Sequence, residues 1–247
     1  MTGIILAAGL GTRLKPWTLT NPKALVPVEG MPMLQRIIEE FKRQGVNHII
    51  VNVHHFGDKI IDFLKKNDFG IEITVSDERD TLLDTGGAIV KILQTLKDKD
   101  YPLIIHNVDI LSNADLSELY KLHSISDADV SLLVSERDSS RKLLFDKDNR
   151  LRGWHDLKSN NYRFIGHGSS EEYQELAFSG IYVINKKAVK EMKELFGEEK
   201  FPIMEYFLSS ERKAKIQGVK RNNLILLDIG KPASLAQASD ILKSILI

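Results

Sequence analysis

The segment between residues 4 and 14 reads Ile4-Ile5-Leu6-Ala7-Ala8-Gly9-Leu10-Gly11-Thr12-Arg13-Leu14. Its apolar first half has the length of a short, fully buried strand. The glycines that follow allow a tight turn whose backbone N–H groups can face a phosphate. A dinucleotide fingerprint would need glycine at Leu14, and the Gly-Lys-Ser/Thr ending of a Walker A loop is absent. The segment therefore predicts a phosphate loop of a third kind that carries an arginine, with a plain strand-to-helix turn as the alternative.

Short apolar runs alternate with amphipathic stretches as far as residue 134. This alternation predicts an α/β fold in which helices cover a parallel sheet. The expected strands are 4–7, 48–53, 71–75, 103–108 and 128–134. The expected helices are 32–45, 59–65 and 87–96, with another that Asp115 caps and that ends at His123.

After Ser135 the pattern is looser and more charged. We expect antiparallel strands at 143–145 and 151–154, then a loop, then a strand at 177–184. Helices are expected at 187–195, 202–208 and 232–245, and strands at 216–219 and 224–227. No linker or repeat interrupts the chain, so a single domain is expected.

Composition excludes several classes of site and partner. The 247 residues include no cysteine, which rules out disulfides, thiolate metal sites and cysteine nucleophiles. The formal net charge is zero, which argues against a nucleic-acid partner. The first apolar run is too short for a signal peptide or a membrane span, so we expect a cytoplasmic protein with no membrane contact.

Lys23 is the second candidate for phosphate binding. It lies between Pro22 and Pro27, which predict a stiff, extended segment. Arg13 and Lys23 would place two cations around a polyphosphate. The alternative for Lys23 is an ordinary solvated lysine.

Two aspartates follow apolar runs and are candidate metal ligands. Asp109 ends the expected strand 103–108, and Asp228 ends 224–227. The carboxyl ends of parallel strands are where open α/β sheets bind ligands. A carboxylate that faces a phosphate loop needs a cation between them, and Mg²⁺ binds one or two carboxylates together with substrate phosphates. The alternative is a turn or capping role for each aspartate.

Paired glycines open one expected helix in Asp84-Thr85-Gly86-Gly87-Ala88. They would allow a flat ligand such as a base to approach closely, or Asp84 or Thr85 would simply cap the helix. Three aromatic residues, Trp154, Tyr162 and Phe178, are candidates for a sugar pocket, although core packing is the alternative for Trp154 and Phe178.

Taken together, residues 6–14 and the run Asn21-Pro22-Lys23-Ala24-Leu25-Val26-Pro27-Val28 resemble the signature of sugar-1-phosphate nucleotidyltransferases. The resemblance spans residues 4–238. It implies a Rossmann-like three-layer α/β/α fold with a central mixed, mainly parallel sheet. It also implies Mg²⁺-dependent transfer of a nucleotidyl group from an NTP to a sugar 1-phosphate. The single domain would comprise a nucleotide-binding core (1–134), a sugar-binding insertion (135–185) and a C-terminal part that completes the metal site (186–247).

The resemblance also implies a role for each matching residue. The catalytic cations are Arg13 and Lys23, and the metal ligands are Asp109 and Asp228. The nucleotide-binding residues are Ala8, Gly9, Gly11, Thr12, Gly86 and Asn107, of which Ala8 and Gly86 lie against the base and ribose. Phe178-Ser179-Gly180 matches the sugar-binding strand. The family usually has glycine directly before the metal aspartate, where this chain has Val108.

Within the family, Leu83-Asp84-Thr85-Gly86-Gly87 and Phe178-Ser179-Gly180-Ile181 resemble short members such as the N-acetylmuramate-1-phosphate uridylyltransferases of cell-wall recycling. This predicts UTP rather than GTP as the nucleotide and N-acetylmuramate 1-phosphate as the acceptor. Mannose- or heptose-1-phosphate guanylyltransferase is the alternative. A non-catalytic, sugar-nucleotide-binding regulatory subunit is the alternative of another class. We expect a monomer or a homodimer.

Overall fold

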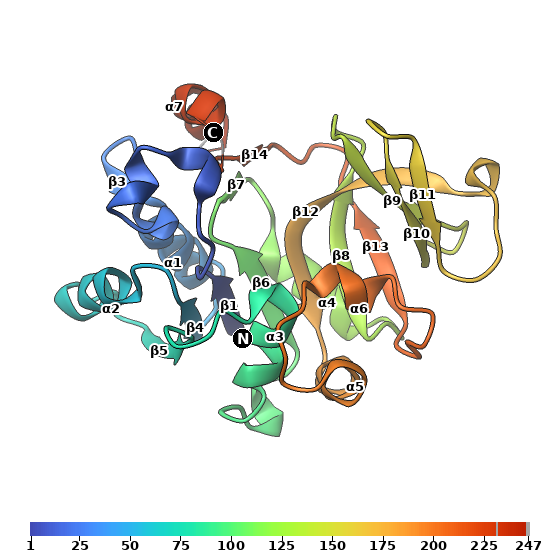
Figure 1. Cartoon of the computed structure of the whole chain (residues 1–247), viewed down its shortest axis with the longest axis horizontal. Coiled ribbons are helices and arrows are strands. Elements are labelled where there is room, and N and C mark those ends of the chain that lie inside the picture. Colours follow the sequence, from blue (N-terminus) through green and yellow to red (C-terminus); the bar gives the residue numbers. More distant parts are fainter. Residues whose placement is uncertain (231, 246–247) are drawn as a thin grey trace.

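The computed structural model describes residues 1–230 and 232–245 and has a three-layer α/β/α architecture (Figure 1). The predicted α/β fold is confirmed. The helices are α1 (Met33–Arg43), α2 (Gly57–Lys66), α3 (Asp84–Ile92), α4 (Leu116–Ser124), α5 (Lys186–Phe196), α6 (Ile203–Phe207) and α7 (Pro232–Ile245). The main sheet contains β1 (Thr2–Leu6), β4 (His48–Val53), β5 (Glu72–Asp77), β6 (Leu103–Asn107), β8 (Val130–Ser135), β9 (Arg141–Phe145), β10 (Leu151–Asp156), β11 (Asn161–Phe164), β12 (Gln174–Ile184) and β13 (Ile216–Lys220).

The central sheet combines a parallel half with an antiparallel half. Strands β6, β1, β4 and β5 are neighbours and run parallel. Strand β12 then pairs antiparallel with β6, β8 and β9, and β13 pairs parallel with β8. Figure 1 shows β9, β10 and β11 at the end of the molecule opposite α1 and α2. Because β1 and β6 are parallel and in register from Thr2↔Leu103 to Leu6↔Asn107, the segments that follow them emerge side by side.

The sheet separates two hydrophobic cores, since neighbouring strand residues point to opposite faces. On one face, Ile5 and Ile104 belong to a cluster that includes residues of α1, α2, α4 and α7. On the other, Ile4 and Ile105 belong to a cluster with α3, α5 and α6. Burial on both faces explains why these strands read as continuous apolar runs.

Local signals account for most of the element boundaries. As predicted, Asp115 caps α4, where its carboxylate accepts a 2.7 Å hydrogen bond from the backbone N–H of Glu118. Helix α3 begins at Asp84, three residues before the predicted start, and ends at Ile92. The predicted loop after β10 is wrong in part, because Asn161–Phe164 forms the edge strand β11.

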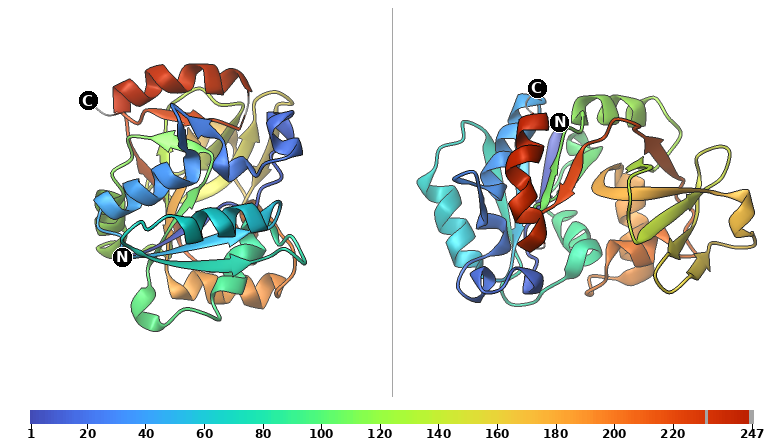
Figure 2. Two further views of the ribbon diagram at one scale, coloured as in Figure 1. Left: turned by 90° about the vertical axis from the view of Figure 1, so that its left-hand side faces the viewer. Right: turned by 90° about the horizontal axis from the view of Figure 1, so that it is seen from above.

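The C-terminal part returns to the parallel half of the molecule. Strand β14 (Leu226–Asp228) pairs antiparallel with β7 (Ile110–Ser112) in a separate ribbon, and β2 (Pro27–Val28) pairs with β3 (Met31–Pro32) in another. Helix α7 packs against β2, β7 and β14, as the views in Figure 2 show. Among the described residues, no helix has the length and apolar character needed to cross a bilayer. The predicted division of the domain into the segments 1–134, 135–185 and 186–247 stays a prediction.

Candidate active site

A cavity of about 400 Å³ lies at the carboxyl ends of β1 and β6. It brings together most of the residues predicted from the sequence. Its lining includes Ala8, Gly9, Gly11, Thr12, Arg13, Lys23, Asn107 and Asp109, together with Asn52, Asp84, Thr85, Val108 and Gly230. The parallel register of β1 and β6 is what places the glycine turn next to Asp109.

The glycine turn is shaped by contacts that only glycine permits at position 11. Gly11 has a φ of 63°, and a Cβ there would lie 2.7 Å from the Thr18 methyl group and 3.0 Å from Lys23 Cβ. The Thr18 hydroxyl donates a 2.8 Å hydrogen bond to the Gly11 carbonyl. Among the described residues, the backbone N–H groups of residues 9–11 find no acceptor. These donors are therefore available to an anionic ligand in the cavity.

Two buried polar side chains that the sequence analysis missed support this turn. Asn52 on β4 accepts a 2.7 Å hydrogen bond from the backbone N–H of Ala7 and donates a 3.0 Å hydrogen bond to Glu78. Glu78 also accepts from the backbone N–H of Leu83, one residue before α3. Burial raises the pKa of Glu78, against the opposing effect of the hydrogen bond from Asn52. The sequence signal was present, since Asn52 interrupts an otherwise apolar strand.

Lys23 and Asp109 form an ion pair in which both side chains are largely buried. The predicted extended segment around Lys23 is wrong in detail, because Lys23–Leu25 forms a 3₁₀ turn. Proline restricts itself and the residue before it, so Pro22, Val26 and Pro27 are constrained while Lys23–Leu25 stays free to turn. The turn is closed by the hydrogen bond from the Leu25 N–H to the Pro22 carbonyl.

Asp228 is not among the residues that line the cavity, but it lies beside Gly230, which is, and it arrives there by a route that differs from the predicted one. Its strand, β14, is not part of the main sheet. It lies opposite β7, with Asp228 in register with Ile110, the residue after Asp109. The Ile229 N–H donates a 2.9 Å hydrogen bond to the Asp109 carbonyl, which fixes the two segments together. The expectation that Asp109 and Asp228 follow strands at the same edge of one sheet is therefore wrong, because β14 belongs to a separate ribbon. The two carboxylates nevertheless lie close together beside Gly230.

Gly230 lies where the charged groups meet. A Cβ at this position would be 2.8 Å from Asp228 Oδ1, 2.9 Å from Arg13 Nη2 and 3.1 Å from Asp109 Oδ2. Arg13 Nη2 lies 3.9 Å from Asp228 Oδ2. Both carboxylates therefore border the same small space, which glycine leaves open.

This pair of carboxylates fits a cation that is also held by substrate. Among the described residues there is no group of three or more His, Cys, Asp or Glu side chains that could hold a metal by itself. Mg²⁺ does not require such a group, since it keeps waters and binds one or two carboxylates together with phosphates. The donor set is thus suited to a magnesium–nucleotide complex rather than to a resident metal.

Gly86 is not among the residues that line the cavity, so its predicted contact with the nucleoside stays a prediction. Asp84 and Thr85 line the cavity, but Gly86 is buried and packs against the Phe201 ring, which leaves no room for a Cβ. Glycine is thus required at position 86 by the packing of the Phe201 ring. Val108 lines the cavity, but its side chain is 3% exposed and belongs to the core.

The predicted sugar-binding strand lies beside the first cavity. In β12, the register with β8 shifts between Phe178 and Tyr182. Within this bulge, a Cβ on Gly180 would lie 2.7 Å from Asn107 Nδ2. Phe178 and Trp154 line a neighbouring cavity of about 220 Å³ with Ser139, Arg141, Lys142, Leu143 and Met204. Tyr162 is not part of this lining and stacks on His155, with ring centroids 3.8 Å apart.

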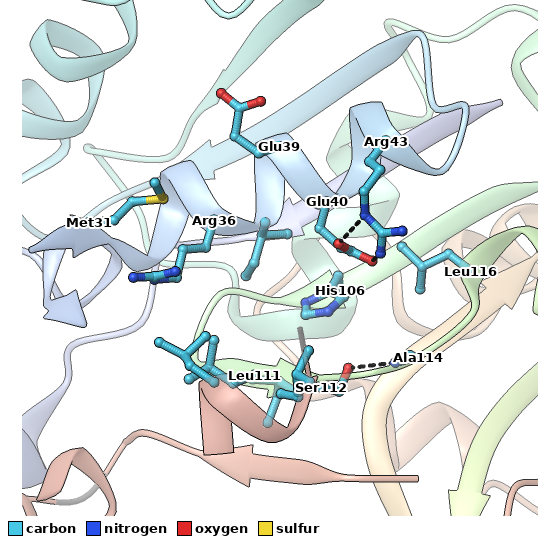
Figure 3. Close-up of a pocket in the computed structure, with 14 residues that line it drawn as sticks. Met31, Arg36, Glu39, Glu40, Arg43, His106, Leu111, Ser112, Ala114 and Leu116 are labelled. Atoms are coloured by element: carbon cyan, nitrogen blue, oxygen red, sulfur yellow. Dashed lines mark hydrogen bonds and ion pairs between the residues drawn. The ribbon is translucent and has the colours of Figure 1, made fainter. Parts of the chain in front are cut away.

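A further cavity of about 250 Å³ lies between α1, β7 and α7, and contains none of the predicted site residues (Figure 3). Its lining combines apolar side chains with charged ones, among which Glu40 pairs with Arg43. The His106 ring is buried there, which lowers its pKa to about 4, and its Nδ1 hydrogen bonds to the Asn107 carbonyl. A buried, neutral histidine that bonds to the backbone indicates a structural role.

A family model and solved structures match the chain along nearly all of its length, and curated relatives match part of it. A sequence model of the family described as nucleotidyl transferase matches residues 2–244. Mannose-1-phosphate guanyltransferases of Debaryomyces hansenii and Candida albicans are each 33% identical over 153 residues. Each match covers 60% of this chain and 42% of the relative, so the chain spans less than half the length of these curated relatives.

Among solved structures, HddC from Yersinia pseudotuberculosis is 26% identical, with a TM-score of 0.77 over 98% of this chain and 99% of that chain. A second structure of HddC, complexed with GMP-PN, is 25% identical, with a TM-score of 0.76 over the same shares of both chains. The similarity to HddC thus includes the core, the region of β9–β11 and the C-terminal part.

Proposed function

Because this chain belongs to the nucleotidyl transferase family, we propose that it joins an NTP to a sugar 1-phosphate, with release of pyrophosphate. The family expected from the motifs is confirmed, and the activity of the chain is our inference from it. The observation that carries the proposal is one cavity that combines Arg13, Lys23 and Asp109 with a glycine turn whose N–H groups find no acceptor among the described residues, and that has Asp228 beside it at Gly230.

In this proposal the residues of the cavity bind and neutralise a triphosphate. The N–H groups of residues 9–11 and the Arg13 guanidinium hold its oxygens, and Lys23 contacts a phosphate from within its ion pair with Asp109. Asp109 and Asp228 would hold Mg²⁺, which neutralises phosphate oxygens when bound. Asn107 and the first turn of α3 border the remaining space, where the nucleoside would lie.

The reaction requires no strong general base. The second pKa of a phosphate ester is about 6, so a sugar 1-phosphate is mostly dianionic at neutral pH. Its oxygen attacks the α-phosphorus, and the bond from that phosphorus to the oxygen bridging the β-phosphorus breaks, so that pyrophosphate leaves with the electron pair. The protein must align the two anions and neutralise their charge. Arg13, Lys23 and the carboxylate pair supply these functions.

The substrate that we propose differs from the preference drawn from the sequence. The named relatives are mannose-1-phosphate guanyltransferases, and the similar HddC structure was solved with GMP-PN. These similarities favour the guanylyltransferase alternative over a uridylyltransferase for N-acetylmuramate 1-phosphate. We therefore propose GTP as the nucleotide and mannose or heptose 1-phosphate as the acceptor. A non-catalytic regulatory subunit is disfavoured, because Arg13, Lys23, Asp109 and Asp228 are all present.

A panel assay of pyrophosphate release tests the proposal. GTP, UTP, CTP and dTTP are each combined with mannose, heptose, glucose and N-acetylmuramate 1-phosphates in the presence of Mg²⁺. We expect kcat/KM for GTP with one of the first two acceptors to exceed every other pair by about tenfold or more. A higher value for UTP with N-acetylmuramate 1-phosphate would restore the original preference. Tight nucleotide-sugar binding without pyrophosphate release from any pair would favour the regulatory subunit.

A further inference from the structure

Arg137 is a half-buried cation that forms no ion pair with a carboxylate of the described residues. It follows β8 by two residues, and its guanidinium donates to backbone carbonyls alone, at 2.8 Å to Phe178 and at 3.2 Å to Asp138. In the described part of the chain, its Nε is buried and has no hydrogen-bond partner. Burial lowers the pKa of Arg137, and the negative charge of Asp228 acts in the opposite direction. A charged group in this state retains unused donors and lacks a counter-ion, which is costly unless a ligand supplies one.

Arg137 is not among the lining residues of either cavity, but it is hydrogen-bonded to strand β12, which contacts both. Its partner Phe178 contributes its ring to the 220 Å³ cavity, opposite Trp154. Two residues further along β12, Gly180 packs against Asn107, which lines the 400 Å³ cavity. Arg137 is thus attached to the β12 bulge, which contributes Phe178 to one cavity and contacts Asn107 at the other, and the charge of Asp228 acts on its guanidinium.

The chemistry of this region suits a sugar 1-phosphate. The apolar faces of Phe178 and Trp154 match the C–H face of a sugar ring, while Ser139, Arg141 and Lys142 offer polar groups around it. A phosphate bound to such a sugar would lie toward the carboxylate pair and would need a cation on that side. A guanidinium is the group best shaped to hold two phosphate oxygens at once.

We propose that Arg137 binds the phosphate of the acceptor sugar 1-phosphate and that Phe178 and Trp154 hold its sugar. This assignment rests on the proposed function and adds to it the residue that positions the nucleophile. Arg13 and Lys23 then neutralise the nucleotide, and Arg137 neutralises the acceptor. The division keeps the attacking oxygen close to the α-phosphorus although both reactants are anions.

Separate KM values for the two substrates test this division of roles. In Arg137→Met we expect KM for the sugar 1-phosphate to rise by roughly ten- to a hundredfold, as for the loss of charge-assisted hydrogen bonds. KM for the NTP should stay within a few-fold of wild type. Arg137→Gln can still donate to the Phe178 carbonyl but has no charge, so it should show the same split.

Arg212→Met is the matched control. Arg212 is also half-buried, donates to the backbone carbonyls of Phe207 and Ala214, and has a pKa that burial lowers. Like Arg137 it lines neither cavity, but its acceptors Phe207 and Ala214 line neither cavity as well, whereas the acceptor Phe178 of Arg137 lines the smaller one. Its replacement should lower the melting temperature without changing either KM. A binding titration adds a readout that does not depend on turnover: Arg137→Gln should weaken binding of the nucleotide-sugar product but not of the NTP.

The outcomes separate this inference from the proposed function. If wild-type protein releases no pyrophosphate with any substrate pair, the proposed function fails. If the wild type is active and folded Arg137→Gln retains its KM for the acceptor, the role of Arg137 fails alone. An equal rise in both KM values, or the same change in Arg212→Met, would make Arg137 a structural residue and also overturn the inference.

Discussion

Asn52 donates a 3.0 Å hydrogen bond to Glu78, and both side chains are almost completely buried beneath the glycine turn. The same amide accepts a hydrogen bond from the Ala7 N–H, and the same carboxyl accepts one from the Leu83 N–H. One pair of side chains therefore links the end of β1 to the start of α3, from opposite sides of the cavity. The relative position of these two walls therefore depends on two buried polar side chains, of which Asn52 also lines the cavity.

Glu78 should make the stability of the fold depend on pH. Burial raises its folded-state pKa above 4.5, the ordinary value, so folding favours the protonated form. Its contribution is fully present below pH 4.5 and is lost as the pH rises through the raised pKa. Relative to Glu78→Gln, the wild type should therefore lose free energy of unfolding as the pH increases, by up to about 1.4 kcal/mol per pH unit.

The measurement is urea unfolding of the wild type and of Glu78→Gln at a series of pH values from 4.5 upward. Glu72→Gln, which changes an exposed glutamate at the start of β5, is the control and should give a curve parallel to wild type. Parallel curves for Glu78→Gln and wild type would mean that Glu78 ionises as easily in the fold as in the unfolded chain.

Gly230→Ala should impair the site and spare the fold. The added methyl would meet the ends of three charged side chains that can move aside, so the cost in stability should be small. Moving Asp109, Asp228 and Arg13 by even ~1 Å should lower kcat by up to about a hundredfold. The measurement is kcat together with the melting temperature.

Gly218→Ala should show the reverse pattern. A Cβ there would lie 2.8 Å from the Phe145 ring within the second core, so it should cost roughly 1–3 kcal/mol of stability. Its kcat should be close to wild type at temperatures where it remains folded. A kcat for Gly230→Ala within twofold of wild type would show that the space beside the carboxylates is not used.

Much of the fold could be predicted because periodicity reports burial. Strands β1, β4 and β6 are buried on both faces and each contains a run of three apolar residues, and the buried face of α1 has helical spacing. Strand β11 was missed because it is a polar edge strand: three of its four residues are exposed, so burial leaves no pattern there. Strand β7 has three residues and follows Asp109 at once, which is too short for a periodic signal.

The site was predictable where its residues are adjacent in sequence and unpredictable where tertiary pairing creates it. The glycine turn and Asp109 follow directly from strand ends. Asp228 was found from its local pattern, but the route that brings it to Asp109 depends on the pairing of β14 with β7. The sequence around Arg137 gave no signal. Its proposed role depends on a hydrogen bond to the Phe178 carbonyl, 41 residues away, and on the cavity that Phe178 lines.

Asp109→Asn and Asp228→Asn should weaken the use of Mg²⁺. Each substitution removes one of the two negative charges that border the space beside Gly230. Turnover at limiting Mg²⁺ should fall sharply in both variants and recover in part at high Mg²⁺, while circular dichroism stays unchanged. Asp115→Asn is the control, because asparagine can cap α4 as aspartate does and position 115 lies outside the cavity. Near-normal turnover of Asp228→Asn at limiting Mg²⁺ would remove this residue from the metal site.

Arg13 provides the most direct test of the phosphate chemistry. Its guanidinium follows the glycine turn, lies 3.9 Å from Asp228 and is about half exposed, so it is free to close on a ligand. In the proposed reaction, charge develops on the departing pyrophosphate during transfer, and a cation there stabilises the transition state more than the bound substrate. Comparable arginines in phosphoryl transfer contribute roughly 10³–10⁵ in rate. We expect Arg13→Ala to lower kcat by orders of magnitude and Arg13→Lys to restore part of it, since lysine lacks the planar fork. Steady-state kinetics on folded protein decide the matter, because a surface arginine without this role would leave kcat within a few-fold of wild type.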